Sequence, residues 1–235
     1  VFTKSKIDLQ PIIDQWCSYI SIIDNQQVQI NIYTDGSGPH SQYSAAWAVS
    51  IYIKDILTDK EYLLGYFCGP VIKDIGHGHF LGATQETNQT AELSALIWAC
   101  LWILSQCPLS ITYNIYSDSA WSIGIAKDYD TSNVHPIQMT LVQSLLYCVN
   151  QKQQVNISHV KAHSDEIHNE FADGLCLCYQ KGSVPPMNDV TQEVLGWPIQ
   201  LPIHHYTAQQ QIHHLALLPI FFNSPQVAQQ YPQVD

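Results

Sequence analysis

The sequence predicts an α/β fold in which a mixed five-stranded sheet is flanked by helices, in the order βββαβαβα. Three strand-like stretches follow one another between residues 28 and 67; in the first, apolar and polar residues alternate, and a period of two is typical of strands. A helical period begins near residue 88, after which strand-like and helix-like stretches alternate as far as residue 180. Strands separated by helices need crossover connections, so we expect both parallel and antiparallel pairs.

The first three strands are expected to form an antiparallel meander. Val28, Ile30 and Ile32 lie on one face of the first strand, which runs into a turn at residues 33–37. Residues 45–53 and 61–67 are the second and third strands, joined by a polar connection. Successive strands with short connections commonly pair with their neighbours.

Each later element has its own pattern. Glu92 and a series of apolar residues spaced three and four apart predict a long helix, with Thr87 or Asn88 as its N-cap and Pro108 beyond its end. The elements expected after it are a strand at 111–115, a short helix, a helix at 137–149, a strand around 155–157 and a helix at about 166–180.

The chain is expected to hold one domain, residues 27–182, between two flanks. Residues 1–26 contain one apolar stretch with helical spacing and are interpreted as an N-terminal flank. Residues 183–235 contain seven of the twelve prolines, many glutamines and little charge, so they are interpreted as a tail or linker. The chain begins at Val1, which suggests a piece of a longer polypeptide.

Four carboxylates and one histidine stand where strands end or helices begin: Asp35, Glu92, Asp118, Asp173 and His163. Taken singly, each acid has an ordinary structural explanation, as part of a turn, as an N-cap or as a solvated helix residue. Taken together they form a pattern. If the first and fourth strands are neighbours, Asp35 and Asp118 emerge at the same edge, and Glu92 opens the helix packed above it.

Such a group of carboxylates predicts a site for divalent cations. Three carboxylates without an arginine to neutralise them repel one another, and burial increases the cost. Divalent cations remove this repulsion, and oxygen ligands favour Mg²⁺ or Mn²⁺ over zinc. Two such ions can activate water and stabilise the leaving oxygen of a phosphodiester. The residues therefore indicate metal-dependent cleavage of phosphodiester bonds.

The overall charge is unusual for an enzyme with a polyanionic substrate. The net charge is −11, and the basic residues are nine lysines with no arginine. Bidentate guanidinium clamping of phosphate is therefore excluded, and affinity has to come from cations, backbone amides, a few lysines or a partner domain. The sequence shows neither a signal peptide pattern nor a run of 18 apolar residues, which predicts an intracellular protein without a membrane partner. The seven cysteines lack C-x-x-C spacing and are expected to be buried, reduced thiols.

Four segments resemble the motifs of the ribonuclease H family. They are Tyr33-Thr34-Asp35-Gly36-Ser37, Thr87-Asn88-Gln89-Thr90-Ala91-Glu92, Ser117-Asp118-Ser119, and the stretch from His159 to Asp173 that contains His163, Asn169 and Glu170. The resemblance covers roughly residues 28–181, includes the order of the elements, and is most specific in the last motif. It implies a type 1 ribonuclease H fold and a ribonuclease H activity.

The resemblance also implies roles for the five site residues. Asp35 corresponds to the carboxylate shared by two metal ions, Glu92 and Asp118 to ligands of one ion, and Asp173 to a ligand of the other. His163 resembles the loop histidine that assists proton transfer and product release. The implied cofactor is two Mg²⁺ ions, for which Mn²⁺ can substitute.

Substrate contacts are implied in the same way. Asn88 and Gln89 correspond to residues that contact ribose 2′-hydroxyls of the RNA strand, with help from backbone groups near Ser37 and Gly38. Trp121 falls where the family places an aromatic residue beside the DNA strand, although its helical setting suits a core role nearly as well. Thr87 corresponds to a residue that contacts a DNA phosphate.

The sequence departs from the family pattern in two places. Residues 119–162 contain only Lys127, Lys152 and Lys161, where many family members carry a basic helix and loop that grip the hybrid. In this respect the chain is similar to the ribonuclease H domains of retroelement reverse transcriptases, in which a neighbouring domain supplies the grip. Residues 71–85 look like an insertion that includes His77 and His79; a surface loop is the favoured interpretation.

Together these observations predict a metal-dependent endonuclease that hydrolyses the RNA strand of RNA/DNA hybrids as part of a larger polypeptide. Its expected partners are the hybrid and a reverse transcriptase or another domain of the same chain. Two alternatives stay open: a catalytically silent scaffold of the same fold, and a related polynucleotidyl transferase of the integrase or transposase kind. The complete set of acids argues against the first. Asn88, Gln89 and His163 argue against the second.

Overall fold

The computed structural model describes residues 28–105, 111–131, 134–162 and 166–182. Its centre is a five-stranded sheet with the order β3-β2-β1-β4-β5. The strands are β1 (Val28–Ser37), β2 (Ala46–Asp55), β3 (Glu61–Pro70), β4 (Thr112–Ser117) and β5 (Gln154–His159). The first three form an antiparallel meander, and β1 also pairs in parallel with β4, which pairs in parallel with β5. The expected mixed sheet is therefore confirmed.

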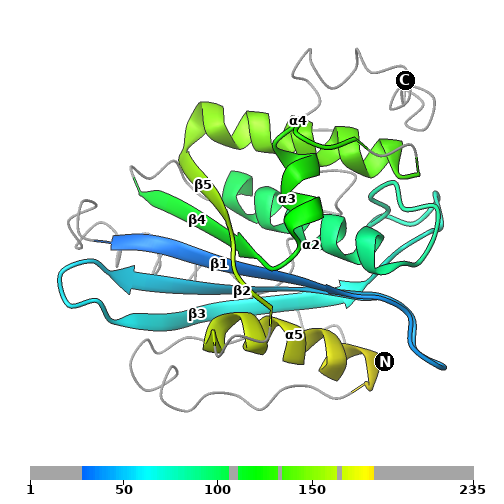
Figure 1. Ribbon diagram of the computed structural model, residues 1–235, viewed down its shortest axis with the longest axis horizontal. Helices are drawn as coiled ribbons and strands as arrows, with labels where there is room; N and C mark the ends of the chain where they lie inside the picture. Colours follow the sequence, from blue (N-terminus) through cyan, green and yellow to red (C-terminus); the bar gives the residue numbers. More distant parts are fainter. Residues whose placement is uncertain (1–27, 106–110, 132–133, 163–165, 183–235) are drawn as a thin grey trace.

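Four helices cover the two faces of this sheet (Figure 1). On one face lie α2 (Asn88–Ser105), α3 (Ala120–Ala126) and α4 (Pro136–Lys152), whereas α5 (Ile167–Gln180) is the helix of the described residues that covers the other. Helix α2 is apolar on nearly all sides because it contacts β1 and β2 on one side and α4 on the other. The expected element order is confirmed, with α3 as the short helix after the fourth strand.

Two apolar cores hold the layers together. The larger one lies on the face of the sheet covered by α2, α3 and α4, and its fully buried side chains include Ile30, Ile32, Ile51, Leu96 and Trp98. The smaller one lies under α5 and includes Tyr33, Tyr52, Tyr66, Leu175 and Cys176. The sheet is therefore buried on both faces where β1 and β2 cross its centre, which fixes the position of the strand that carries Asp35.

Several elements differ from the expected bounds by a few residues. Strand β1 continues through the expected turn, because Gly36 and Ser37 pair with Trp47 and Ala46 of β2. Strand β3 extends to Pro70, whose carbonyl accepts a hydrogen bond of 2.9 Å from Trp47 Nε1. These extensions depend on backbone pairing with the neighbouring strand. The pattern of apolar and polar residues within one segment does not reveal such pairing.

The helix starts are set by short polar side chains. Thr87 is the N-cap of α2, since its hydroxyl accepts from the backbone nitrogen of Thr90 at 3.1 Å, and the Thr90 hydroxyl accepts from the backbone nitrogen of Thr87 at 2.9 Å. At α3 the N-cap is Ser119, whose side chain accepts from the backbone nitrogen of Ser122. The structural explanation of Asp118 as an N-cap is therefore wrong, because its neighbour fills that position.

Some expectations fall partly or wholly outside the described residues. These are the flanks 1–26 and 183–235, the end of the first long helix at Pro108, and the position of His163. The five cysteines within the described residues are all free, with Cys100 and Cys176 buried and the others partly buried. Among the described helices, none combines the length and hydrophobicity needed to cross a bilayer.

Candidate active site

The parallel pairing of β1 with β4 brings two of the predicted acids together. Thr34 pairs with Ser117 at the end of this ladder. Asp35 is the next residue of β1, and Asp118 directly follows the end of β4, so both emerge at the same edge of the sheet. The sequence prediction depended on these strands being neighbours, and the sheet order confirms that they are.

Glu92 joins these acids because α2 packs directly on β1. A Cβ atom on Gly36 would overlap the backbone nitrogen of Glu92, so the absence of a side chain allows the contact. Single carboxylate oxygens of Asp35, Glu92 and Asp118 all lie within 4.8 Å of one another. Asp35 is 6% exposed and Glu92 is 4% exposed, which rules out the explanation of Glu92 as a solvated helix residue.

Asp173 reaches the same place from the opposite face of the sheet. It lines a pocket of about 330 Å³ together with the other three acids, Glu170, Asn169, Asn88 and the turn of β1 around Ser37. No lysine is among the described residues that line this pocket. The structure therefore brings together all four carboxylates that the sequence predicted.

The proximity of these acids changes their proton affinities. Burial, followed by the charges of Asp118 and Asp173, raises the pKa of Asp35 to about 7. Burial, followed by the charges of Asp35 and Asp118, raises the pKa of Glu92 well above its usual range. Both shifts arise because negative charges are held together with little water to screen them. A strongly raised pKa in a pocket is a common property of functional sites.

The pocket fits divalent cations. Its donors are carboxylate and amide oxygens, which hard cations such as Mg²⁺ and Mn²⁺ prefer. Two buried oxygens that belong to lining residues have no hydrogen-bond partner among the described residues, namely Oε2 of Glu92 and Oδ1 of Asn169. Buried acceptors without donors are costly. A bound cation with its water would satisfy them and neutralise the acids.

Asn169 is a site residue to which the sequence analysis assigned no role of its own. Its Nδ2 donates to Oδ2 of Asp118 at 3.2 Å, and the side chain is 2% exposed. His159 also contacts Asp118, because its Nε2 lies 3.0 Å from the main-chain oxygen of Asp118. Asn169 precedes Asp173 by one helical turn on α5, so both lie on the face that meets the pocket. That spacing is the signal that could have identified it.

Only some of the residues expected to bind substrate lie at the pocket. Ser37 and Asn88 line the pocket, and Gly38 adjoins it by donating its backbone N–H to Oδ1 of Asn88 at 3.1 Å. Gln89 is exposed beside the pocket but does not line it, and the hydroxyl of Thr87 bonds with Thr90. Trp121 is partly buried against the larger core, and His77 and His79 do not line the pocket.

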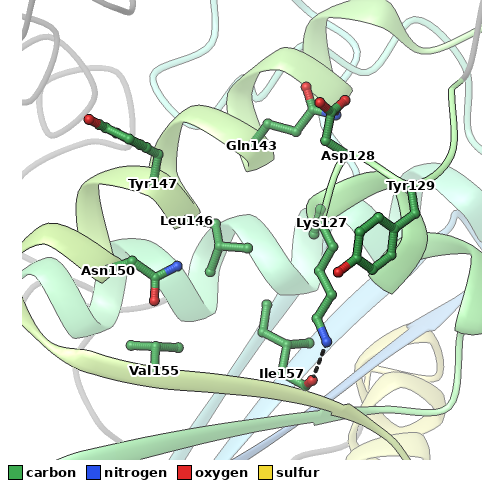
Figure 2. Close-up of a pocket in the computed structure, with 10 residues that line it drawn as sticks. Lys127, Asp128, Tyr129, Gln143, Leu146, Tyr147, Asn150, Val155 and Ile157 are labelled. Atoms are coloured by element: carbon green, nitrogen blue, oxygen red, sulfur yellow. Dashed lines mark hydrogen bonds between the residues drawn. The ribbon is translucent and has the colours of Figure 1, made fainter.

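A second hollow, of about 430 Å³, lies between α3, α4 and β5 and contains none of the predicted site residues (Figure 2). Lys127 crosses it, and its Nζ donates to the main-chain oxygen of Ile157 at 2.8 Å. Tyr129 and Tyr147 stand at its rim and are 81% and 50% exposed. One of the three lysines between residues 119 and 162 thus bonds to an edge strand and is held away from the acidic pocket.

A five-stranded mixed sheet with five acids around one pocket, the four predicted carboxylates and Glu170, defines an α/β protein with a candidate cation-binding centre. The RNase H family model matches residues 27–177, so the chain belongs to the ribonuclease H family. A ribonuclease H of Orientia tsutsugamushi (strain Boryong) is 29% identical over 167 residues, which are 67% of this chain and 85% of that protein. The chain is accordingly a ribonuclease H enzyme, as the four motifs predicted.

Two solved structures are also similar to the chain. RNase H1 of the archaeon Halobacterium salinarum NRC-1 is 16% identical with a TM-score of 0.46, over 66% of this chain and 99% of that one. The protease-reverse transcriptase of prototype foamy virus is 22% identical with a TM-score of 0.46, over 70% of this chain and 22% of that one.

Proposed function

We propose that this chain hydrolyses the RNA strand of RNA/DNA hybrids endonucleolytically, with divalent cations, and leaves a 3′-hydroxyl and a 5′-phosphate. The observation that carries the proposal is the pocket in which Asp35, Glu92, Asp118 and Asp173 converge, with no lysine among the described residues that line it. Family membership supports the same substrate class.

In this proposal the acids divide between two ions. Asp35, Glu92 and Asp118, whose oxygens lie within 4.8 Å of one another, would hold one ion, and Asp35 together with Asp173, which lines the same pocket, would hold the other. When bound, Mg²⁺ ions lower the pKa of water and stabilise charge on the reacting phosphate. Asn169 keeps the Asp118 carboxylate in place through its 3.2 Å hydrogen bond. Water attacks phosphorus, and the bond from phosphorus to the 3′-oxygen breaks.

Asn88 is suited to recognising the RNA strand. The Gly38 backbone N–H can only donate, so the Asn88 atom that it meets is the amide oxygen. The Asn88 nitrogen is then the group that can donate to a ribose 2′-hydroxyl, which distinguishes RNA from DNA. His163 is proposed to assist proton transfer, so His163→Ala should slow turnover and leave cation binding intact.

We further propose that residues 27–182 are the catalytic domain of a larger, retroelement-type polypeptide whose other domains hold the hybrid. The net charge of −11 and the engagement of Lys127 with β5 support this arrangement. Electrostatic attraction is the main source of affinity for a nucleic acid backbone. With nine lysines and a net charge of −11, this chain supplies little of that attraction.

A substrate panel tests the proposal. Purified protein is incubated with end-labelled RNA/DNA hybrid, duplex RNA and duplex DNA, with Mg²⁺ or with a chelator, alongside Asp35→Asn. The expected result is Mg²⁺-dependent cleavage of the RNA strand of the hybrid alone, lost in the variant. Cleavage of duplex DNA would favour a polynucleotidyl transferase, and no cleavage at any protein concentration would favour a silent scaffold.

A further inference from the structure

One side chain at the end of α5 holds both ends of the connection between β1 and β2. Nε2 of Gln180 donates to the main-chain oxygens of Gly38, at 2.9 Å, and Ser44, at 3.0 Å. Its Oε1 accepts from the hydroxyl of Ser37 at 3.4 Å. Gln180 is 142 residues from Gly38 in the sequence, and it lies outside the four motifs. Its amide therefore closes the loop between β1 and β2.

This loop adjoins the pocket through Gly38. The two polar backbone groups of Gly38 are both engaged, the oxygen with Gln180 and the N–H with Oδ1 of Asn88. A further hydrogen bond holds the end of the loop next to β2, where Ala45 donates its N–H to Oε2 of Glu86 at 3.1 Å. Gln180, Gly38 and Asn88 thus form a chain of hydrogen bonds from the end of α5 to the rim of the pocket.

The Gly38 bond determines which way the Asn88 amide faces. Asn88 is exposed, so nothing buried around it fixes its orientation, and an amide can rotate to exchange its oxygen and nitrogen. A fixed Gly38 N–H binds the oxygen and leaves the nitrogen as the outward donor. If the loop shifts, that preference is lost.

We propose that Gln180 is a positioning residue for recognition of the RNA strand: it fixes the Gly38 backbone, which orients the Asn88 amide toward the ribose 2′-hydroxyl. The inference rests on the proposed function for the role of Asn88. Gln180 does not line the pocket, so it acts through the loop and leaves the carboxylates unchanged.

The test uses Gln180→Met, which keeps the length of the side chain and removes its hydrogen bonds. The matched control is Gln143→Met, because Gln143 also donates to main chain, to the oxygen of Ile125 at 2.9 Å, but lines the other hollow. We expect Gln180→Met to raise KM for the hybrid about fivefold, the factor that one neutral hydrogen bond carries, with kcat unchanged. Gln143→Met should leave KM unchanged.

A double-mutant cycle separates this role from a general loss of structure. If Gln180 acts through Asn88, Gln180→Met should add no further increase in KM to Asn88→Ala. Independent, multiplying increases would overturn the proposal, as would an unchanged KM in Gln180→Met or an equal rise in the control.

Hydrogen exchange of the Gly38 amide tests the structural part without catalysis. Exchange should be faster in Gln180→Met than in wild type and unchanged in Gln143→Met, and unaltered exchange in Gln180→Met would overturn the proposal. A wild-type enzyme that fails to cleave hybrid would remove the proposed function. An active wild type whose KM does not respond to Gln180→Met would remove this inference alone.

Discussion

Gly36 of β1 lies against the first turn of α2 so closely that a Cβ atom at this position would overlap the backbone nitrogen of Glu92. The contact joins the strand that carries Asp35 to the helix that carries Glu92. Because residue 36 has no side chain, the two elements can approach until their carboxylates share one pocket.

Gly36→Ala should therefore damage both the fold and the site. The overlapping atoms belong to the α2 backbone, so the helix has to move. We expect a loss of about 1–3 kcal/mol in the free energy of unfolding and a large loss of hybrid cleavage, measured by urea unfolding and by initial rates. Gly174→Ala is the control, because a Cβ there meets no atom within 4 Å and alanine suits a helix. Wild-type stability in Gly36→Ala would contradict the packing described.

Stability of the metal-free protein should fall as the pH rises from about 4 to about 7. Burial, then Asp118 and Asp173, raises the pKa of Asp35 from 3.8 to about 7. In this range the folded state keeps a proton that the unfolded state has lost, so folding is favoured at the acidic end. Asp35→Asn should flatten this dependence and raise the free energy of unfolding at pH 7, on the order of 2 kcal/mol. Urea unfolding between pH 4 and 8 in chelator measures it.

Added Mg²⁺ should reverse the difference in the free energy of unfolding between wild type and Asp35→Asn at pH 7. A cation that binds only the folded state stabilises it by an amount that grows with the logarithm of the ratio of its concentration to Kd. Wild type should therefore gain more stability from Mg²⁺ at pH 7 than Asp35→Asn does. Equal gains in the two proteins would show that Asp35 is not a cation ligand, whereas the same pH dependence in both would show that the pKa of Asp35 is not raised.

Asn169 should contribute to turnover through Asp118. Asn169→Ala removes the donor to the Asp118 carboxylate, a bond to a charged group whose loss costs roughly tenfold to a hundredfold. We expect this loss in kcat, with KM nearly unchanged. Asn169→Asp should also need less Mg²⁺ for half-maximal rate, because it adds a negative charge beside Asp118 and a bound cation relieves the repulsion between them. An unchanged kcat in Asn169→Ala would show that the bond is only structural.

Binding of hybrid by the isolated chain should depend weakly on salt. Each neutralised phosphate contributes a slope of about −0.9 to a plot of log K against log salt. With nine lysines in the whole chain and Lys127 bonded to Ile157, we expect a slope of about −1 to −3. Fluorescence anisotropy with Asp118→Asn and a labelled hybrid measures it without cleavage. A slope steeper than about −5 would indicate a basic surface that the proposal does not include.

Much of the fold could be predicted because it depends on local patterns. The alternation around Val28 and Ile30, the helical spacing after Glu92 and the order of elements survive in the structure. The ends of the strands could not be predicted, since Gly36 and Ser37 extend β1 only through their partners in β2. The carboxylates were predictable as a group because the expected order of elements places them at one edge of the sheet, although each acid alone has an ordinary structural explanation.

The supporting hydrogen bonds could not be predicted from the sequence, because they join residues whose proximity depends on the strand order. One polar chain runs across the sheet from Asn156 to Asn114, from Asn114 to Asn31 and from Asn31 to Glu61, at 2.9–3.0 Å. His168 lies 3.2 Å from the second oxygen of Glu61 and so joins α5 to β3. Each asparagine is an ordinary strand residue when considered alone.

The most direct test of the central claim is the rate of RNA-strand cleavage in an RNA/DNA hybrid as a function of Mg²⁺ concentration, for wild type and Asp118→Asn. We expect a rate that rises from zero with Mg²⁺ in wild type and stays near zero in the variant, although the variant remains folded. Equal rates in the two proteins, or cleavage by wild type that survives a chelator, would contradict the assignment of this pocket as the cation-dependent hydrolytic centre.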